Sequence, residues 1–80
     1  MHELAIAEAI VDRVAETAAG RRVVRVTVEI GDQTCVSCEA LAFSFGLVAE
    51  GTGVHGAELV TRLVPGDALN VKSLEIEEAA

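Results

Sequence analysis

The sequence has no tryptophan, no tyrosine and two phenylalanines among its 80 residues. Its hydrophobic core must therefore consist of aliphatic side chains, which account for most of the 51% of apolar residues. This apolar fraction is well above that of chains that stay disordered. With one proline and no low-complexity stretch, the sequence offers no candidate linker. We therefore expect one domain spanning residues 1–80.

Basic residues are also scarce, since 6 Lys and Arg stand against 13 Asp and Glu, a net charge of −7. A nucleic-acid interface needs clustered basic side chains that replace phosphate counterions, so nucleic acid is not the expected partner. The same argument applies to anionic lipid. No segment approaches the roughly 18 apolar residues of a membrane span. These features exclude three classes of partner or location.

The expected compartment is the cytoplasm. The first residues lack the basic start and the apolar stretch of a secretory signal. The two cysteines, Cys35 and Cys38, are too close in sequence to build a disulfide framework. Both observations favour a reducing environment.

The first half of the chain predicts a helix followed by a strand. Apolar residues recur at helical spacing over residues 4–19, and Gly20 follows as a residue that tolerates a left-handed turn. Residues 22–30 alternate between apolar and polar, which is typical of a strand with one covered face. The residues expected on that face are Val24, Val26, Val28 and Ile30.

A second helix is expected over residues 38–50. Ser37 precedes it and is a good N-cap, because its hydroxyl can accept a hydrogen bond from a free backbone N–H of the first turn. The expected apolar stripe consists of Leu41, Phe45 and Val48, widened by Phe43 and Leu47.

The last part of the chain predicts two strands, over residues 57–64 and 69–77. The apolar pattern of the second slips in phase near Ser73, which a β-bulge would explain. The turn at residues 65–67 should return this strand as a hairpin partner of the preceding one. The expected fold is α+β in two layers, with a small mixed three-stranded sheet packed by two helices in the order α-β-α-β-β.

The N-terminal Met1-His2-Glu3 is the first candidate for chemistry. The α-amine, the backbone amide and the imidazole of His2 together form a nitrogen-rich chelating unit of the kind that Ni²⁺ and Cu²⁺ accept. The carboxylate of Glu3 can add an oxygen donor. From spacing alone, a solvated terminal histidine explains the same residues.

Cys35 and Cys38 form a CxxC unit at the start of the second helix, where the helix dipole would favour a thiolate. Three interpretations remain open: semi-buried packing residues, a redox or modified thiol pair, and accessory metal ligands. His55 lies in a glycine-rich loop and is interpreted as solvated. No nucleophile triad, phosphate-binding glycine loop or paired-carboxylate pattern is present, so we expect a protein that is not an enzyme.

Six sequence segments, taken in their order along the chain, resemble the HypA family of nickel-insertion accessory proteins. They cover nearly the whole chain: Met1–Leu4, Val28–Gly31, Ala40–Phe45, Glu50–Thr52, Gly56–Leu59 and Leu69–Ile76. The resemblance implies a nickel metallochaperone domain in which His2 is the principal Ni²⁺ ligand, Met1 the amine donor and Glu3 an adjacent ligand or tuner. It implies a maturation GTPase and the large subunit of nickel–iron hydrogenase as partners, with urease maturation as a further client. Some members place an aspartate beside the nickel site where this sequence has Ser37.

The chain departs from that family at one place. Members carry a zinc-binding segment with two CxxC pairs between the last two strands, whereas here Pro65 is followed directly by Gly66. We therefore expect no structural Zn²⁺, and we interpret the junction as an excision, because both flanks match the family. A hinge this short also favours strand exchange, so we expect some homodimer. The two alternatives to the nickel function are a CxxC thiol or redox module and a metal-free interaction domain.

Overall fold

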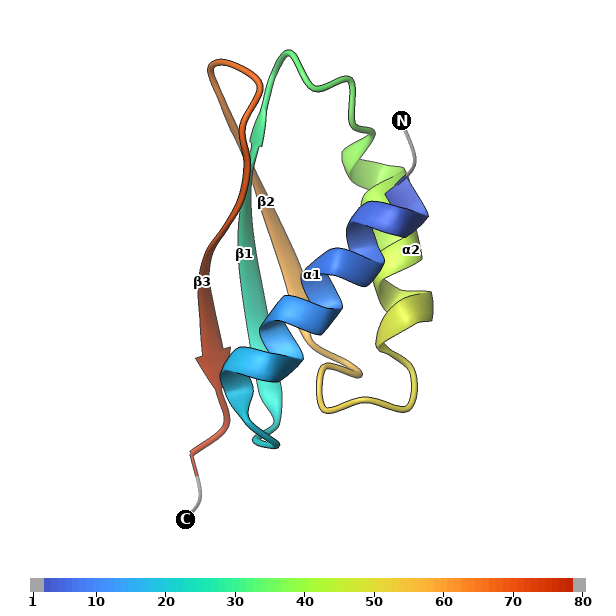
Figure 1. The fold of residues 1–80 in the computed structure, drawn as a ribbon, viewed down its shortest axis with the longest axis vertical. Helices are drawn as coiled ribbons and strands as arrows, with labels where there is room; N and C mark the ends of the chain where they lie inside the picture. The colour runs from blue at the N-terminus through green and yellow to red at the C-terminus, as the bar shows by residue number, and fades with distance from the viewer. Residues whose placement is uncertain (1–2, 79–80) are drawn as a thin grey trace.

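The computed structural model describes residues 3–78, which form two helices and three strands (Figure 1). The elements are α1 (Glu3–Ala18), β1 (Val23–Gly31), α2 (Cys38–Ala49), β2 (Glu58–Val64) and β3 (Leu69–Ile76). The expected α+β class and the order α-β-α-β-β are confirmed, and every boundary lies within one residue of its prediction. Neither helix in this part of the chain is long and apolar enough to cross a membrane.

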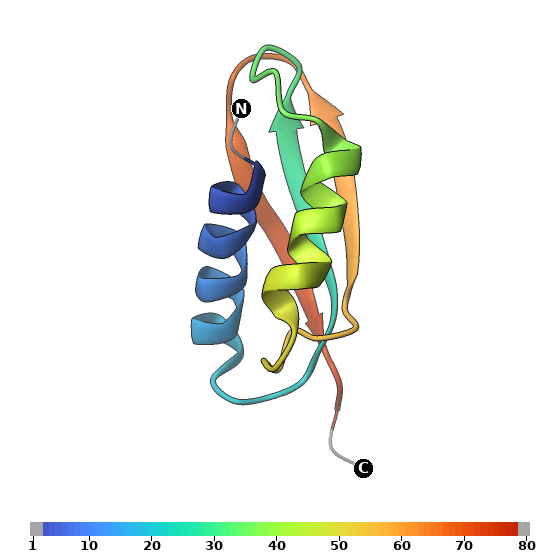
Figure 2. The ribbon, with the colours of Figure 1, turned by 90° about the vertical axis from the view of Figure 1, so that its right-hand side faces the viewer.

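The molecule has two layers, with the sheet on one side and both helices on the other (Figure 1). α1 and α2 lie side by side across the same face of the sheet (Figure 2). Their inner faces and the inner face of β1 enclose one core, in which Phe45 is the single aromatic side chain among the buried residues described. The core consists of Ala7, Ile10, Val11, Val14, Ala18, Val23, Val26, Val28, Ile30, Leu41, Phe45, Ala49 and Val54.

Three residues expected in the core are exposed instead. Val24 is 45% exposed because β1 holds an extra residue there: Val23 pairs with Ile76 and Arg25 with Glu75, so Val23 turns inward in its place. On α2 the inward residues are Leu41, Phe45 and Ala49, each four positions apart. Two further residues lie off this stripe: Phe43, 71% exposed, and Leu47, 51% exposed.

The sheet has the strand order β2-β1-β3, with β1 in the centre. β2 runs parallel to β1, as expected for strands joined through α2. β3 runs antiparallel to β1, so the predicted hairpin between β2 and β3 is wrong. The reason is that the inner face of β1 is apolar and buried. When one strand pairs with each edge of β1, the apolar residues of β2 and β3 both pack against this core.

The connection between β2 and β3 crosses over the end of β1. Gly31 N–H donates to the carbonyl of Ala68 at 2.7 Å, and Gln33 N–H donates to the carbonyl of Gly66 at 2.8 Å. In the other direction, Gly66 N–H donates to Oδ1 of Asp32 at 3.1 Å. The crossing is close enough that a Cβ atom on Gly31 would lie 2.6 Å from the carbonyl carbon of Gly66. Only glycine therefore fits at residue 31.

The phase slip in β3 is a bulge, as predicted. Ser73 pairs with Thr27, and the next pair along joins Val71 to Val28, which leaves Lys72 as the extra residue. The bulge resets the alternation, so that Val71 and Leu74 both pack against the core.

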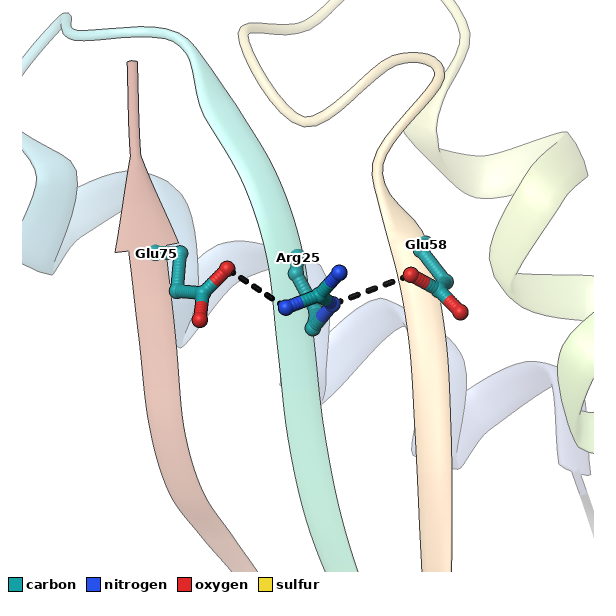
Figure 3. A network of polar contacts seen from close by, with 3 residues as sticks. All are labelled: Arg25, Glu58 and Glu75. Atoms are coloured by element: carbon teal, nitrogen blue, oxygen red, sulfur yellow. Dashed lines mark hydrogen bonds and ion pairs between the residues drawn. The ribbon is translucent and has the colours of Figure 1, made fainter. Parts of the chain in front are cut away.

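One ion-pair network crosses the face of the sheet that points away from the helices (Figure 3). Arg25 on β1 donates from Nε to Oε1 of Glu58 at 2.9 Å and from its terminal nitrogen to Oε2 of Glu75 at 2.8 Å. The hydrogen bond to Glu58 and the charge of Glu75 raise the pKa of Arg25 above its usual range. The guanidinium thus stays charged and joins all three strands on the face that the helices leave open.

Candidate metal centre

The predicted nickel ligands lie only partly within the structure. Met1 and His2 fall outside the described residues, whereas Glu3 is the first residue of α1 and is partly buried.

Glu3 joins the starts of the two helices. Its Oε2 accepts a hydrogen bond from the backbone N–H of Ser37 at 3.0 Å, across 34 positions of sequence. The start of α1 and the first turn of α2 accordingly meet at the same end of the molecule (Figures 1 and 2). Because Glu3 follows His2 directly in the chain, the predicted Met1–Glu3 chelating unit is attached at this end.

Ser37 contributes to this end in two ways. Besides the backbone N–H that it donates to Glu3, its hydroxyl accepts from Ala40 N–H at 3.2 Å and caps α2, as predicted. The hydroxyl is thus used by the helix at the position where some family members have an aspartate. Glu39 in the first turn adds a favourable charge at the same helix end.

Cys35 and Cys38, the CxxC unit, lie on either side of Ser37 in the sequence. Cys35 and Cys38 are both free thiols; Cys35 is exposed and Cys38, the first residue of α2, is partly buried. Cys35 has a φ of 60°, a left-handed conformation uncommon for a residue with a side chain. Thr34 stabilises this turn, because its hydroxyl donates to the carbonyl of Gly31 at 2.8 Å and accepts from Val36 N–H at 3.3 Å.

The described residues do not complete a metal site without Met1 and His2. Within 3–78, no group of three or more His, Cys, Asp and Glu side chains is placed to hold a metal ion. A structural zinc site normally needs four ligands, and the CxxC unit supplies two. The residues in this part of the chain therefore do not fit the zinc centre that the family resemblance implies.

His55, the second histidine of the sequence, belongs to the opposite end of the molecule. It lies in the loop between α2 and β2, where its carbonyl accepts from a terminal nitrogen of Arg22 at 3.2 Å. Figure 1 shows this loop at the opposite end of the molecule from the start of α1. The interpretation of His55 as an exposed loop residue is confirmed.

A family model described as "Hydrogenase/urease nickel incorporation, metallochaperone, hypA" matches residues 1–76. The chain belongs to the HypA family. The hydrogenase maturation factor HypA of Geobacter metallireducens is 42% identical to it over 66 residues, which cover 82% of this chain and 60% of that protein. That of Geotalea daltonii is 45% identical over 65 residues, covering 81% and 59%. The chain thus spans about 60% of the length of these HypA relatives.

A solved structure supports the fold. The solution structure of the Ni metallochaperone HypA from Helicobacter pylori aligns with a TM-score of 0.57, covering 98% of this chain and 88% of that one. At 15% sequence identity, this likeness concerns the architecture alone.

Sequence reasoning missed the role that Glu3 has in the structure. We predicted Glu3 as a ligand or tuner, and one of its oxygens is a hydrogen-bond acceptor for Ser37. The only signal in the sequence was the family position of Ser37, which is beside the nickel site in the resemblance.

Proposed function

We propose that this chain is the nickel-binding domain of a HypA-type metallochaperone and that it is not an enzyme. It takes up Ni²⁺ as cargo for the maturation of nickel–iron hydrogenase. The observation that carries the proposal is the family match over residues 1–76, which includes the Met1–Glu3 segment. The family is described by nickel incorporation into hydrogenase and urease, which supports this cargo.

The proposed ligands are the α-amine of Met1, the backbone amide and imidazole of His2, and an oxygen of Glu3. Nitrogen-rich tetragonal sites suit Ni²⁺. The hydrogen bond from Ser37 N–H to Glu3 Oε2 supports a positioning role, since it fixes the residue next to His2 against α2. Carboxylates hydrogen-bonded in this way orient neighbouring ligands in metal sites. Glu3 accordingly positions the chelating unit through one oxygen.

Calorimetry with Ni²⁺ tests the proposal on the intact chain with an unblocked first residue. We expect His2→Ala to weaken binding by at least about 100-fold, since loss of a ligand exceeds the 10–100-fold cost of losing an outer partner. His55→Ala is the matched control and should leave affinity unchanged, because His55 lies at the other end of the molecule. Acetylation of the α-amine should weaken binding in the same way as His2→Ala. Equal affinity in His2→Ala and the unmodified chain would refute the ligand set.

The partners follow from the same proposal. A maturation GTPase and the hydrogenase large subunit are the proposed recipients of the bound nickel, with urease maturation as a second client. A homodimer formed by exchange of β3 also stays a prediction, with residues 65–68 as the hinge. We further propose that the chain carries no structural zinc, in agreement with the incomplete ligand set of residues 3–78.

A thiol function is the second candidate, and one observation favours it: Cys35 is a free, exposed thiol three positions from Cys38 at a helix N-terminus. X-ray absorption of the nickel-loaded chain separates the two. Nitrogen and oxygen donors would support the Met1–Glu3 site, whereas sulfur-only donors would identify the CxxC unit as the metal site. Turnover of a disulfide substrate by the metal-free chain would support the redox function.

A further inference from the structure

An apolar groove separates α1 from β3 and has a volume of about 790 Å³. It exists because α1 packs mainly against α2, so the flank of α1 and the inner side of β3 are only partly covered. The exposed Ala5 and Ala9 form part of its α1 wall, and these small side chains leave it open. Its larger apolar lining residues are Ile6, Ile10 and Val14 from α1, Val28 from β1, and Leu69, Val71 and Leu74 from β3.

The charge of the groove is opposite to that of the protein. Its only charged lining residues are Arg13 and Lys72, whereas the chain as a whole has 13 acidic and 6 basic residues. Within residues 3–78, neither Arg13 nor Lys72 has a carboxylate within the 4 Å of an ion pair, although Arg22 and Arg25 do. Two unpaired cations beside an apolar floor favour a ligand that combines apolar and acidic side chains.

One side of the groove is also an unpaired strand edge. β3 is the terminal strand of the sheet, and all its backbone pairing in the described residues is with β1. The outer N–H and C=O groups of an edge strand are a ready template for a further strand. An extended segment satisfies these groups along the edge, whereas a docked helix leaves them without partners.

We propose that this groove binds an extended, acidic segment of a partner protein, which adds to β3 as a fourth strand beside α1. Its apolar side chains enter the groove on alternate positions, and its carboxylates lie near Arg13 and Lys72. The bulge that presents Lys72 at this edge provides selectivity, because a charged edge residue disfavours neutral or basic strands and favours an acidic one. The proposal does not depend on nickel binding, since the groove contains none of the proposed ligands.

The probe is a synthetic peptide of alternating valine and glutamate, as long as the eight residues of β3. A peptide with valine and glutamate at helical spacing is the comparison probe. Binding to the intact, isotope-labelled chain is followed by NMR titration and amide hydrogen exchange. We expect the alternating peptide to bind more tightly than the helical one and to slow exchange of β3 amides at the outer edge, with no slowing in β2.

Charge reversal tests the recognition of the carboxylates. We expect Lys72→Glu to weaken binding of the alternating peptide about fivefold, because an attraction becomes a repulsion at an exposed site. Arg62→Glu is the matched control, since it changes net charge equally at an exposed position on β2 outside the groove. Unchanged circular dichroism would establish that both variants fold.

Other results would overturn the proposal. If Lys72→Glu and Arg62→Glu weaken peptide binding equally, the effect comes from net charge and not from the groove. Tighter binding of the helical peptide, or no slowing of exchange in β3, would exclude strand addition. Slowed exchange in β3 that depends on protein concentration without any peptide would identify a second copy of this chain as the occupant instead.

Discussion

Gly31→Ala tests whether the crossing between β2 and β3 holds the sheet together. The added Cβ would lie 2.6 Å from the carbonyl carbon of Gly66 and 2.8 Å from the nitrogen of Ala68. Both are backbone atoms, so no side-chain rotation can relieve the contact. The crossing segment must move away from the end of β1, and the hydrogen bond from Gly31 N–H to Ala68, now 2.7 Å, must lengthen.

The magnitude follows from three contributions. Overpacking a close contact costs about 2–3 kcal/mol of stability. Weakening one backbone hydrogen bond costs about 1 kcal/mol more. Replacing glycine by alanine restricts the unfolded chain, which raises stability by about 0.5–1 kcal/mol. We therefore expect Gly31→Ala to lower the free energy of unfolding by about 2–3.5 kcal/mol, a large part of the stability of a small domain.

Urea unfolding followed by circular dichroism measures this change, which should appear as a lower midpoint with an unchanged slope. The matched control is Gly46→Ala, in the interior of α2, where a Cβ meets nothing within 4 Å. This control should raise stability by about 0.5–1 kcal/mol, because alanine is the better helix former. If Gly31→Ala is as stable as the unmodified chain, the close crossing over β1 is not a structural constraint and the reasoning fails.

Two further predictions concern α2. Ser37→Ala should lower stability by about 1 kcal/mol in urea unfolding, since it removes the N-cap hydroxyl but keeps the backbone N–H that bonds Glu3. Ser44→Ala, inside the helix, is the control. Phe45→Ala should cost about 3–4 kcal/mol because Phe45 is buried in the core, as a thermal or urea melt would record. Phe43→Ala should change stability by less than about 0.5 kcal/mol, and equal losses at the two phenylalanines would contradict the assignment of their faces.

The local structure could be predicted from sequence because it depends on local rules. Alternation located β1, and the cap at Ser37 followed from its hydroxyl and the apolar run after it. The bulge in β3 was visible as a slip of one residue in the alternating pattern near Ser73, next to the extra residue Lys72. Each of these features involves residues close together in the chain.

The pairing of β3 could not be predicted in the same way. The turn chemistry of residues 65–67 suits a hairpin, but which edge receives β3 depends on where the buried apolar surface lies once α2 has brought β2 beside β1. Likewise, the exposure of Phe43 and Leu47 depends on α1, which occupies the flank of α2 and leaves those residues outward. These outcomes are properties of the assembled layers.

The site combines both kinds of information. A histidine after the first methionine is a weak signal when considered alone, and the contact from Glu3 to Ser37 connects two segments 34 positions apart that sequence rules treat separately. That contact connects the start of α2 to the proposed N-terminal chelate: Glu3, the residue after His2, accepts a hydrogen bond from the backbone of α2's N-cap, at the helix end that favours a carboxylate. The groove between α1 and β3 lies along the flank of α1, so the proposed metal segment and the proposed docking surface involve different parts of this helix. If both proposals hold, His2→Ala should weaken nickel binding and leave peptide binding unchanged, and Lys72→Glu should do the reverse.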